Sequence, residues 1–313
     1  MMGIAVAFLF AGALLTSGCD EMLRGSARDY VHKSFRVEPG GRLVLDSDSG
    51  SIEVSSGGMD QVRVDVEREL RGSSDLEAEQ NLKQMRLDFR QDGNDIHIYA
   101  RRPEDRFSAN WGSRLRLRFV VLVPDRYDLD LKTGGGSINV NDLEGTVRAK
   151  TLGGSLNFGH IQGALDGETS GGSITLAGGT GPVNVETSGG SIKIGRVQGP
   201  VKAHTSGGSV AVEEVQGRIK ATTMGGSVRA TLTSQPDGDC ELSTSGGSIH
   251  ASLNRNLDLN LDASTSGGSV RTDIPVTTQG EISKRRLNGR MNAGGPNLRL
   301  HTLCGNFTIT AIE

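Results

Sequence analysis

The chain has 313 residues, a net charge of −3 and an isoelectric point near 6.1, a balance that gives no reason to expect a nucleic-acid partner. Its 45 glycines and 8 prolines follow no Gly-X-Y period, which excludes collagen. Aromatic residues make up only 4% of the chain. A core must therefore be built from Val, Ile, Leu, Ala and Thr, as in a thin, stacked structure.

The first residues have the pattern of an export signal. The apolar run from Ile4 to Leu15 is short for a membrane span and is placed as the core of a signal peptide would be. It leads into Leu15-Thr16-Ser17-Gly18-Cys19, which resembles the lipobox of bacterial lipoproteins. The resemblance implies that the signal peptide 1–18 is removed and that Cys19 is lipidated, which would hold the protein on a membrane surface. An uncleaved anchor, or secretion with a free Cys19, is the alternative.

Residues 19–33 are polar and lack periodicity, which predicts a tether after the lipidated Cys19. Residues 34–131 are expected to form an N-terminal β-rich cap or the first coils, because apolar residues alternate through 35–54 and 62–69. A capping box at Ser74–Glu77 precedes apolar residues at helical spacing and predicts one short helix at about 75–86. Residues 87–101 are expected to form a hairpin that turns at 91–94, and a loop that contains Trp111 follows.

A repeated phrase organises the rest of the chain. Thr-Ser-Gly-Gly-Ser-Ile, or a close variant, begins at residues 133, 151, 169, 187, 205, 223, 244 and 265. The first six copies are 18 residues apart and the next two intervals are 21. Each unit contains two short stretches with alternating apolar residues, so we expect two strands per coil. Residues 132–313 are therefore predicted to form an all-β, parallel β-solenoid with C-terminal closing rungs; a sandwich of hairpins would not repeat with the same polarity.

Stacking of such coils places equivalent residues about 4.8 Å apart. The threonines that enter the corners should then form a structural ladder: Thr151, Thr169, Thr187, Thr205 and Thr223. The glycines beside them suit tight corners. The last rung ends close to Glu313, where we expect an edge that is available for strand pairing.

Few residues suggest chemistry. Calcium-binding nine-residue repeats carry Gly and Asp where this chain has Ile192 and Ile194, so calcium is not expected in the corners. The stacked column Glu168, Glu186 and His204 is the candidate for a cation site or for acid–base chemistry. A solvated strand face would have the same composition. No metal or cofactor is predicted.

Two further features leave alternatives open. Cys240 and Cys304 could form a disulfide in an oxidising compartment or remain separate thiols. The basic run Lys284–Arg286, with Arg290, could contact phospholipid headgroups or an anionic glycan, or could be a solvated closing loop. A polysaccharide-active enzyme would need aromatic platforms for sugars, and the repeats from 133 to 270 contain no Trp or Tyr and only Phe158.

Residues 35–54, the repeated Gly-Gly-Ser corners and the ending at 294–309 resemble the bacterial putative-adhesin family, a domain-of-unknown-function group of envelope-associated β-solenoids. The resemblance covers about residues 35–313 and brings no catalytic residue or cofactor. Together with the lipobox at Cys19, it implies a non-catalytic, lipid-anchored interaction module of the bacterial cell envelope, on the periplasmic face or the cell surface. Its expected partners are the membrane, through the anchor, and a surface glycan or an envelope protein. The alternatives are a scaffold that self-associates end to end, as bactofilins do, and, third, a polysaccharide-active enzyme.

Overall fold

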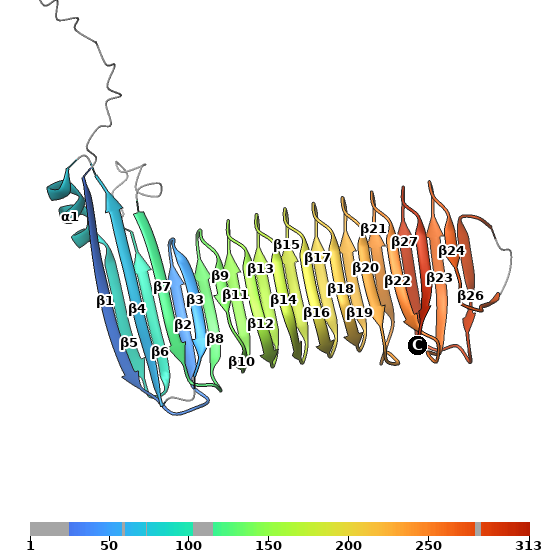
Figure 1. Ribbon diagram of the computed structural model, residues 1–313, viewed down its shortest axis with the longest axis horizontal. Helices are drawn as coiled ribbons and strands as arrows, with labels where there is room; N and C mark the ends of the chain where they lie inside the picture. The colour runs from blue at the N-terminus through green and yellow to red at the C-terminus, as the bar shows by residue number, and fades with distance from the viewer. Residues whose placement is uncertain (1–24, 58–59, 73, 103–114, 279–282) are drawn as a thin grey trace, which may run out of the picture.

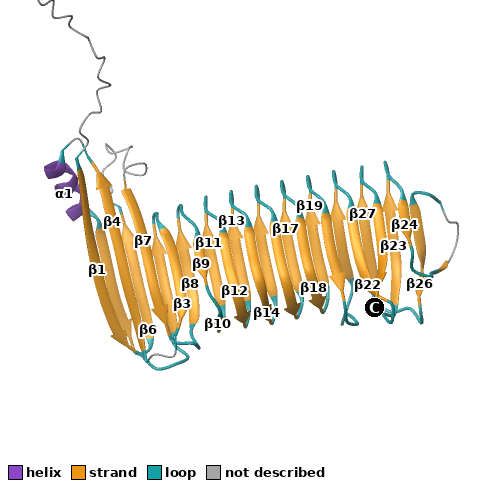
Figure 2. Cartoon of the chain, in the orientation of Figure 1, coloured by secondary structure: helices purple, strands orange, loops and turns teal. Residues whose placement is uncertain are grey.

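The computed structural model describes residues 25–57, 60–72, 74–102, 115–278 and 283–313. In this part the chain forms a long rod of two facing β-sheets, with 14 strands in each (Figure 1). Strands dominate the described residues, and one helix lies at the N-terminal end of the rod (Figure 2). The expected signal peptide, Cys19 and Trp111 lie outside the described residues.

The middle of the rod is built from parallel coils in register, each of which adds one strand to each sheet; for example, Thr169 pairs with Thr187. Sheet A contains the coil strands β9 (Ile138–Val140), β12 (Leu156–Gln162), β14 (Ile174–Thr180), β16 (Ile192–Gln198), β18 (Val210–Gln216), β20 (Val228–Leu232) and β22 (Ile249–Asn254), and the short β10 (Leu143–Glu144). Sheet B contains β8 (Asp128–Thr133), β11 (Val147–Thr151), β13 (Leu165–Thr169), β15 (Val183–Thr187), β17 (Val201–Thr205), β19 (Ile219–Thr223) and β21 (Cys240–Thr244). The predicted parallel solenoid is confirmed.

The core lies between the sheets, because each strand turns alternate side chains inward. In β16, Ile192 and Ile194 are buried while Lys193 between them is exposed. Burying one such aliphatic side chain contributes about 1.5–3 kcal/mol. A coil supplies only two such strands, so the core is thin and each coil depends on its neighbours for burial.

A Gly-Gly corner leads from sheet B to sheet A in each coil, and its two glycines differ in role. A Cβ on Gly154 would lie 2.0 Å from the carbonyl oxygen of Gly136 on the preceding coil. A Cβ on Gly153 would meet nothing within 4 Å. At this corner the second glycine is therefore required by close approach of the backbones, whereas the first is not.

Two ladders of hydrogen bonds join the corners. Thr187 Oγ1 donates to the Gly172 carbonyl of the preceding coil at 2.7 Å and accepts from the Gly190 amide at 3.3 Å. The same arrangement occurs at Thr151, Thr169, Thr205 and Thr223. A second ladder, which the sequence did not lead us to expect, links the serines that follow the glycines. The Ser191 amide, for example, donates to Ser173 Oγ at 3.2 Å.

Replacing Thr205 by valine is expected to lower the free energy of unfolding by about 1–3 kcal/mol. Valine keeps the shape of the side chain but leaves the Gly190 carbonyl and the Gly208 amide without this hydroxyl partner. Thr205→Ser keeps the hydroxyl and should lose less stability in urea unfolding. A valine variant as stable as the serine variant would show that the ladder does not stabilise the corner.

The stacked coils begin with β2 (Arg42–Ser47) in sheet B and β3 (Ser51–Ser56) in sheet A, because Ile52 pairs with Ile138. Five strands extend the sheets beyond this coil: β6 (Asp95–Arg101) and β5 (Arg86–Asp92) in sheet B, and β7 (Leu115–Val123), β4 (Gln61–Arg71) and β1 (Ser26–Arg36) in sheet A. The β5–β6, β4–β7 and β1–β4 pairs are antiparallel, unlike the coils.

The predicted helix is α1 (Asp75–Gln84), which begins as expected and ends two residues before the expected end at 86. Its N-cap, Ser74, accepts a hydrogen bond from the Glu77 amide at 3.2 Å. The helix packs Ala78 and Leu82 against β1 and β4 at the end of the rod (Figure 1). No helix of the described residues has the length and apolar character to cross a membrane.

Residues 26–33 of the predicted tether are part of β1. The strand pairs with β4 along its whole length, from Ser26 opposite Arg71 to Arg36 opposite Gln61. Its inward Asp29 forms two hydrogen bonds with Arg68, at 2.8 and 2.5 Å. The polar composition concealed the strand, because an edge strand carries charged residues even on its inner side.

The C-terminal rung lies inside the rod and does not form its end. β27 (Asn297–Thr302) lies between β21 and β23 (Leu259–Thr265), and β28 (Phe307–Ile312) lies between β22 and β24 (Val270–Thr272). The edge expected near Glu313 is therefore wrong. The physical reason is apolar content: β27 and β28 bury large side chains that need neighbours on both sides, whereas β24 exposes two of its three residues.

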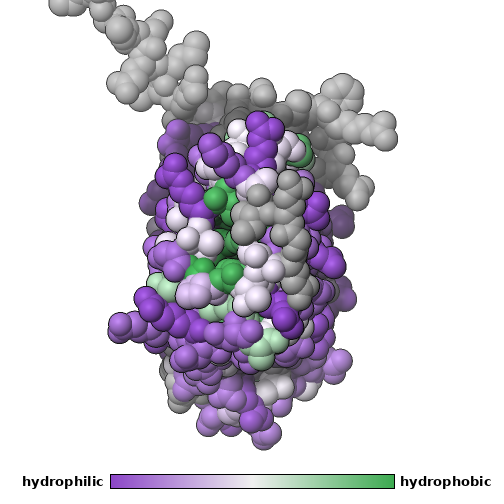
Figure 3. All heavy atoms as spheres, turned by 90° about the vertical axis from the view of Figure 1, so that its right-hand side faces the viewer, coloured by the Kyte–Doolittle hydropathy of each residue, from purple (hydrophilic) through white to green (hydrophobic). Residues whose placement is uncertain are grey.

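The C-terminal end of the rod is closed by short and capped strands. Beyond β24, Asp273 Oδ1 accepts a hydrogen bond from the Ala311 amide of β28 at 2.8 Å. Sheet B ends in antiparallel pairing of β26 (Arg286–Met291) and β25 (Thr277–Thr278). Seen from this end, apolar side chains gather at the centre with polar ones around them (Figure 3). Short strands and side-chain caps oppose the addition of further strands.

Candidate functional site

The outer face of sheet B carries the three residues that the sequence singles out for a cation site or acid–base chemistry. Strand pairing places Glu168 beside Glu186, and Glu186 beside His204. We call this row of outward side chains the outer column. Its neighbouring members in the coils are Lys132, Lys150 and Thr222.

Two of the three candidate residues, Glu168 and His204, already have partners within the outer column. Lys150 Nζ lies 2.8 Å from both carboxylate oxygens of Glu168, and His204 Nδ1 lies 2.7 Å from Thr222 Oγ1. Among the described residues, no group of three or more His, Cys, Asp and Glu side chains could hold a metal ion. The geometry of the column is that of a polar strand face with contacts from coil to coil.

A second column runs beside the outer column on sheet B and has the same character. Its members are Asp130, Arg148, Asp166, Asn184, Lys202, Lys220 and Glu241. Asn184 donates to Asp166 at 2.9 Å, and Lys220 lies 2.8 Å from Glu241. Exposed pairs of this kind contribute only about 0–1 kcal/mol. These pairs therefore add little to the stability of the rod.

A pocket of about 570 Å³, which sequence reasoning missed, lies at a step in sheet A. β7 extends past β3, because their pairing begins only at Arg118 opposite Ser51. The overhanging Leu115–Leu117 segment and the corner residues Ser49 and Gly135 line the space. We call it the ledge pocket. Its signal in the sequence is the length of the strands that lead to it, nine to eleven residues in β7 and β4 against five to seven in most coil strands.

Arginine and glutamate side chains alternate beside the ledge pocket. Glu69 lies between Arg28 and Arg116 on neighbouring strands. The hydrogen bond from Arg28, 2.9 Å long, lowers the pKa of the Glu69 carboxyl. Arg116 adds to this effect through its charge but forms no ion pair with another described residue. Ser49 Oγ is buried and has no hydrogen-bond partner among the described residues.

Cys240 and Cys304 are free thiols, so the disulfide considered from the sequence is not formed. Cys240 is buried at the start of β21, opposite Leu298 of β27. Cys304 follows the other end of β27, and the four steps from Leu298 to Thr302 span about 13 Å. A disulfide requires Cα atoms within about 7 Å.

Thiol reagents are expected to modify Cys304 rapidly and Cys240 only after unfolding. Burial raises the pKa of the Cys240 thiol, which leaves little reactive thiolate near neutral pH. Peptide mass mapping after brief treatment with iodoacetamide measures the two rates, and Cys304→Ser removes the fast site as a control. Rapid labelling of Cys240 in the folded protein would contradict its burial.

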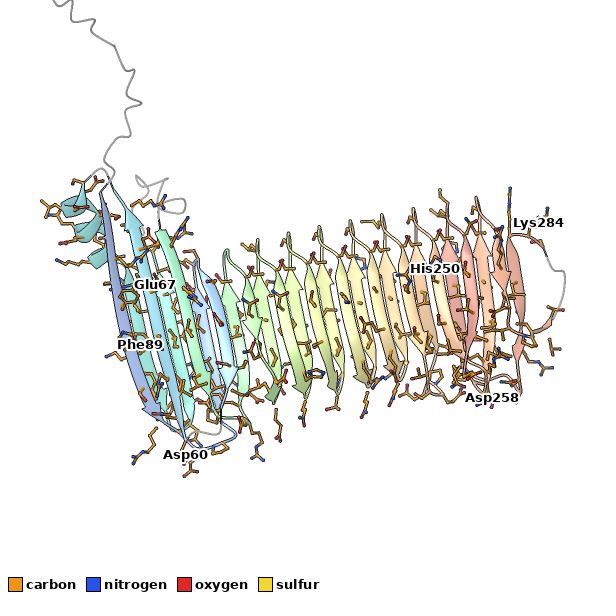
Figure 4. All side chains as sticks on the ribbon, viewed as in Figure 1. Asp60, Glu67, Phe89, His250, Asp258 and Lys284 are labelled. Atoms are coloured by element: carbon orange, nitrogen blue, oxygen red, sulfur yellow. The ribbon has the colours of Figure 1, made fainter. Side chains whose placement is uncertain are left out.

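The basic run Lys284–Arg286 and Arg290 lie at the C-terminal end of the rod, where Lys284 projects from the last strands (Figure 4). The carbonyls of Lys284 and Arg285 accept hydrogen bonds from the amides of Val270 and Thr265, each at 2.9 Å. The backbone of the run therefore closes the last coil. Contact of its exposed side chains with phospholipid or anionic glycan stays a prediction.

The rod of stacked two-strand coils with Gly-Gly corners is a repeat β-solenoid. Residues 41–310 match the family described as Toastrack DUF4097. The match spans most of the chain, which belongs to this family. The predicted membership of a family of unknown function is thereby confirmed.

Several solved structures are similar to this chain at low identity. A putative adhesin from Parabacteroides merdae is 8% identical with a TM-score of 0.41, and the match covers 91% of this chain and 96% of that one. A putative adhesin from Bacteroides fragilis is 10% identical with a TM-score of 0.34, and the match covers 91% and 97%. A structure from Parabacteroides distasonis named as a putative lipid binding protein is 10% identical with a TM-score of 0.32, over 91% and 97%. No curated protein matches the chain.

Proposed function

We propose that the protein is a non-catalytic interaction module, exported and anchored to an envelope membrane through Cys19. It binds a surface glycan or an envelope protein along the outer face of sheet B. One observation carries the proposal: two polar columns run in register from coil to coil along this face. A face with a constant repeat of about 4.8 Å suits an extended partner with many similar groups.

The affinity of such binding would come from the number of contacts along the rod. Each exposed ion pair, such as Lys150 with Glu168 or Lys220 with Glu241, is weak by itself and can be exchanged for a contact with a partner. Contacts made in sequence by one rigid body act at a high effective concentration. A row of weak contacts on a rod can therefore give firm binding without a deep pocket on this face.

Co-sedimentation of the full-length protein with insoluble glycan and protein fractions of the cell envelope tests binding. We expect retention at low salt and release near 1 M salt, where the screening length falls to about 3 Å. Lys202→Glu with Lys220→Glu should weaken retention, because both side chains lie on the second column. Lys193→Glu on sheet A is the matched control. Failure of the unaltered protein to bind any envelope fraction would refute the proposal.

The anchor is tested separately by substitution of Cys19. Radiolabelled fatty acid should be incorporated into the unaltered protein, which should pellet with membranes. Cys19→Ser should lose both the label and the membrane association. A variant that still pellets with membranes would favour the uncleaved anchor.

End-to-end assembly remains the alternative to a binding module. The strand edge expected near Glu313 is not free, because β28 is paired with β22 and β24 on its two sides. The outermost strand of sheet A at that end, β24, has only three residues. At the other end, the edge strand β1 carries the charged residues Lys33 and Asp29 on its inner side, a pattern that opposes strand addition. Sedimentation velocity at rising concentration should show one species; filaments would favour the scaffold.

A further inference from the structure

We propose that the ledge pocket binds a carboxylate-bearing sugar, such as a uronate unit of an envelope glycan. The choice of a sugar rests on the proposed function, whereas the site itself rests on the geometry of the pocket. The pocket lies on sheet A and is separate from the two polar columns of sheet B. It would hold one unit of the polymer at a defined place on the rod.

The shape of the ledge pocket is that of a small-ligand site. Its volume of about 570 Å³ falls within the range of about 300–1,000 Å³ that is usual for such sites. It has an apolar side, formed by Leu115 and Leu117, and a polar side, formed by Ser49 and the charged residues. A Cβ on Gly135 would meet nothing within 4 Å, so the wall beside this corner is open.

Two polar groups that line the pocket form no hydrogen bond or ion pair with another described residue. Ser49 Oγ is buried without a hydrogen bond among the described residues, a state that usually costs stability. Arg116 forms no ion pair with another described residue, although it stands in a row with the paired Arg28 and Glu69. A ligand that offers an anion to Arg116 would pair with its guanidinium. Ser49 also lines this space, and rotation of its side chain would bring Oγ to an oxygen or hydroxyl of the ligand.

The neighbouring charges narrow the class of ligand. Glu67, labelled in Figure 4, and Glu69 line the pocket and can accept hydrogen bonds from sugar hydroxyls. The same two carboxylates would repel the two charges of a phosphate more than the single charge of a carboxylate. Arginine binds a carboxylate through two parallel hydrogen bonds. A sugar with one carboxylate and several hydroxyls fits this set best.

Isothermal titration of the full-length protein with oligogalacturonate, and with the neutral galactose oligomer as control, tests the proposal. We expect binding of the acidic oligomer, at least about tenfold weaker binding by Arg116→Gln, and no change for Arg63→Gln. Arg63 lies on the same outer face but outside the pocket. Equal binding of the neutral oligomer, or an unchanged affinity of Arg116→Gln, would overturn the assignment.

Two leucine substitutions, one in the pocket and one outside it, test where the ligand binds. Gly135→Leu should fill the pocket and abolish binding, whereas Gly153→Leu, at the equivalent corner position one coil further, should bind normally. Circular dichroism establishes that both variants are folded. If Gly135→Leu binds both the oligomer and the envelope fractions as the unaltered protein does, the ledge pocket is not the binding site. The inference then fails, and the proposed function stands. Binding of inorganic phosphate without binding of the uronate would also overturn the class of ligand.

Discussion

Gly154→Ala is expected to destabilise the solenoid by about 3 kcal/mol or more, the upper range of overpacking. The new Cβ would lie 2.0 Å from the Gly136 carbonyl oxygen and 2.2 Å from its carbonyl carbon. Both are backbone atoms of the preceding coil, so no side chain can move to make room. The coils would have to separate, which would break the Thr and Ser ladders of that corner.

Gly153→Ala is the matched control, because its Cβ would meet nothing within 4 Å. We expect its midpoint of urea unfolding to lie close to that of the unaltered protein. Similar losses in the two variants would mean that the corner is not built by backbone contact. Cys304 already stands at the first-glycine position of its own corner, which agrees with the tolerance of this position.

Phe307→Ala is expected to cost about 3–5 kcal/mol, the usual range for a fully buried phenylalanine. Phe307 pairs with Ile249 on one side and Val270 on the other, and it is 0% exposed. The substitution would leave a cavity between two packed coils. If the C-terminal strands formed the end of the rod, one side of the ring would face solvent and the loss would be smaller.

Val270→Ala on the terminal strand β24 is the comparison. Val270 is only partly buried and has a paired strand on one side, so we expect a loss below about 1.5 kcal/mol. Chemical unfolding measures the loss of stability in the two variants and in Ile249→Ala. We expect the loss in Ile249→Ala to be large, like that in Phe307→Ala, and not small, like that in Val270→Ala. A Val270 variant as unstable as the Phe307 variant would contradict the order of the strands.

The coils could be predicted from the sequence because each one is held by the same contacts with its nearest neighbours, and these contacts repeat at a constant interval. Alternation set by residues such as Ile192, Lys193 and Ile194 fixes which side chains face inward, and a constant interval requires parallel stacking. The threonine ladder follows from the same register. The serine ladder was missed because a short polar residue beside glycines is ordinary in a turn, although its presence in every copy was a signal.

The two ends could not be predicted, because there the order along the chain and the order in space differ. Residues 95–101 pair with the earlier Arg42–Ser47 strand, and the last rung enters between two earlier ones. The alternation of apolar and polar residues identifies such strands but does not show which strands pair with them. The ledge pocket was missed for the same reason: it exists only because β7 continues past the corner that contains Ser49.

The candidate column was found in part. Its members Glu168, Glu186 and His204 lie side by side, as the repeat interval requires. Their partners depend on side-chain conformation: Lys150 reaches Glu168, and Thr222 reaches His204. Periodicity therefore predicts which side chains are neighbours but not which hydrogen bonds they form.

The last rung is inserted between two rungs that precede it in the chain, with β27 between β21 and β23 and β28 between β22 and β24. This order of strands is central to the fold, because it leaves short, capped strands at the end of the rod. Disulfide formation between engineered cysteines measures this order directly. Ser264 of β23 pairs with His301 of β27, while Ser243 of β21 lies on the far side of His301. Adjacent strands are about 4.8 Å apart and can be bridged, whereas strands two places apart are about 9.6 Å apart and cannot.

In a Cys304→Ser background, Ser264→Cys with His301→Cys should form a disulfide under mild oxidation. Ser243→Cys with Ser264→Cys should not. Peptide mapping without reductant identifies the bridges. Bridging of the second pair and not of the first would mean that the coils stack in simple chain order, and would contradict the fold described.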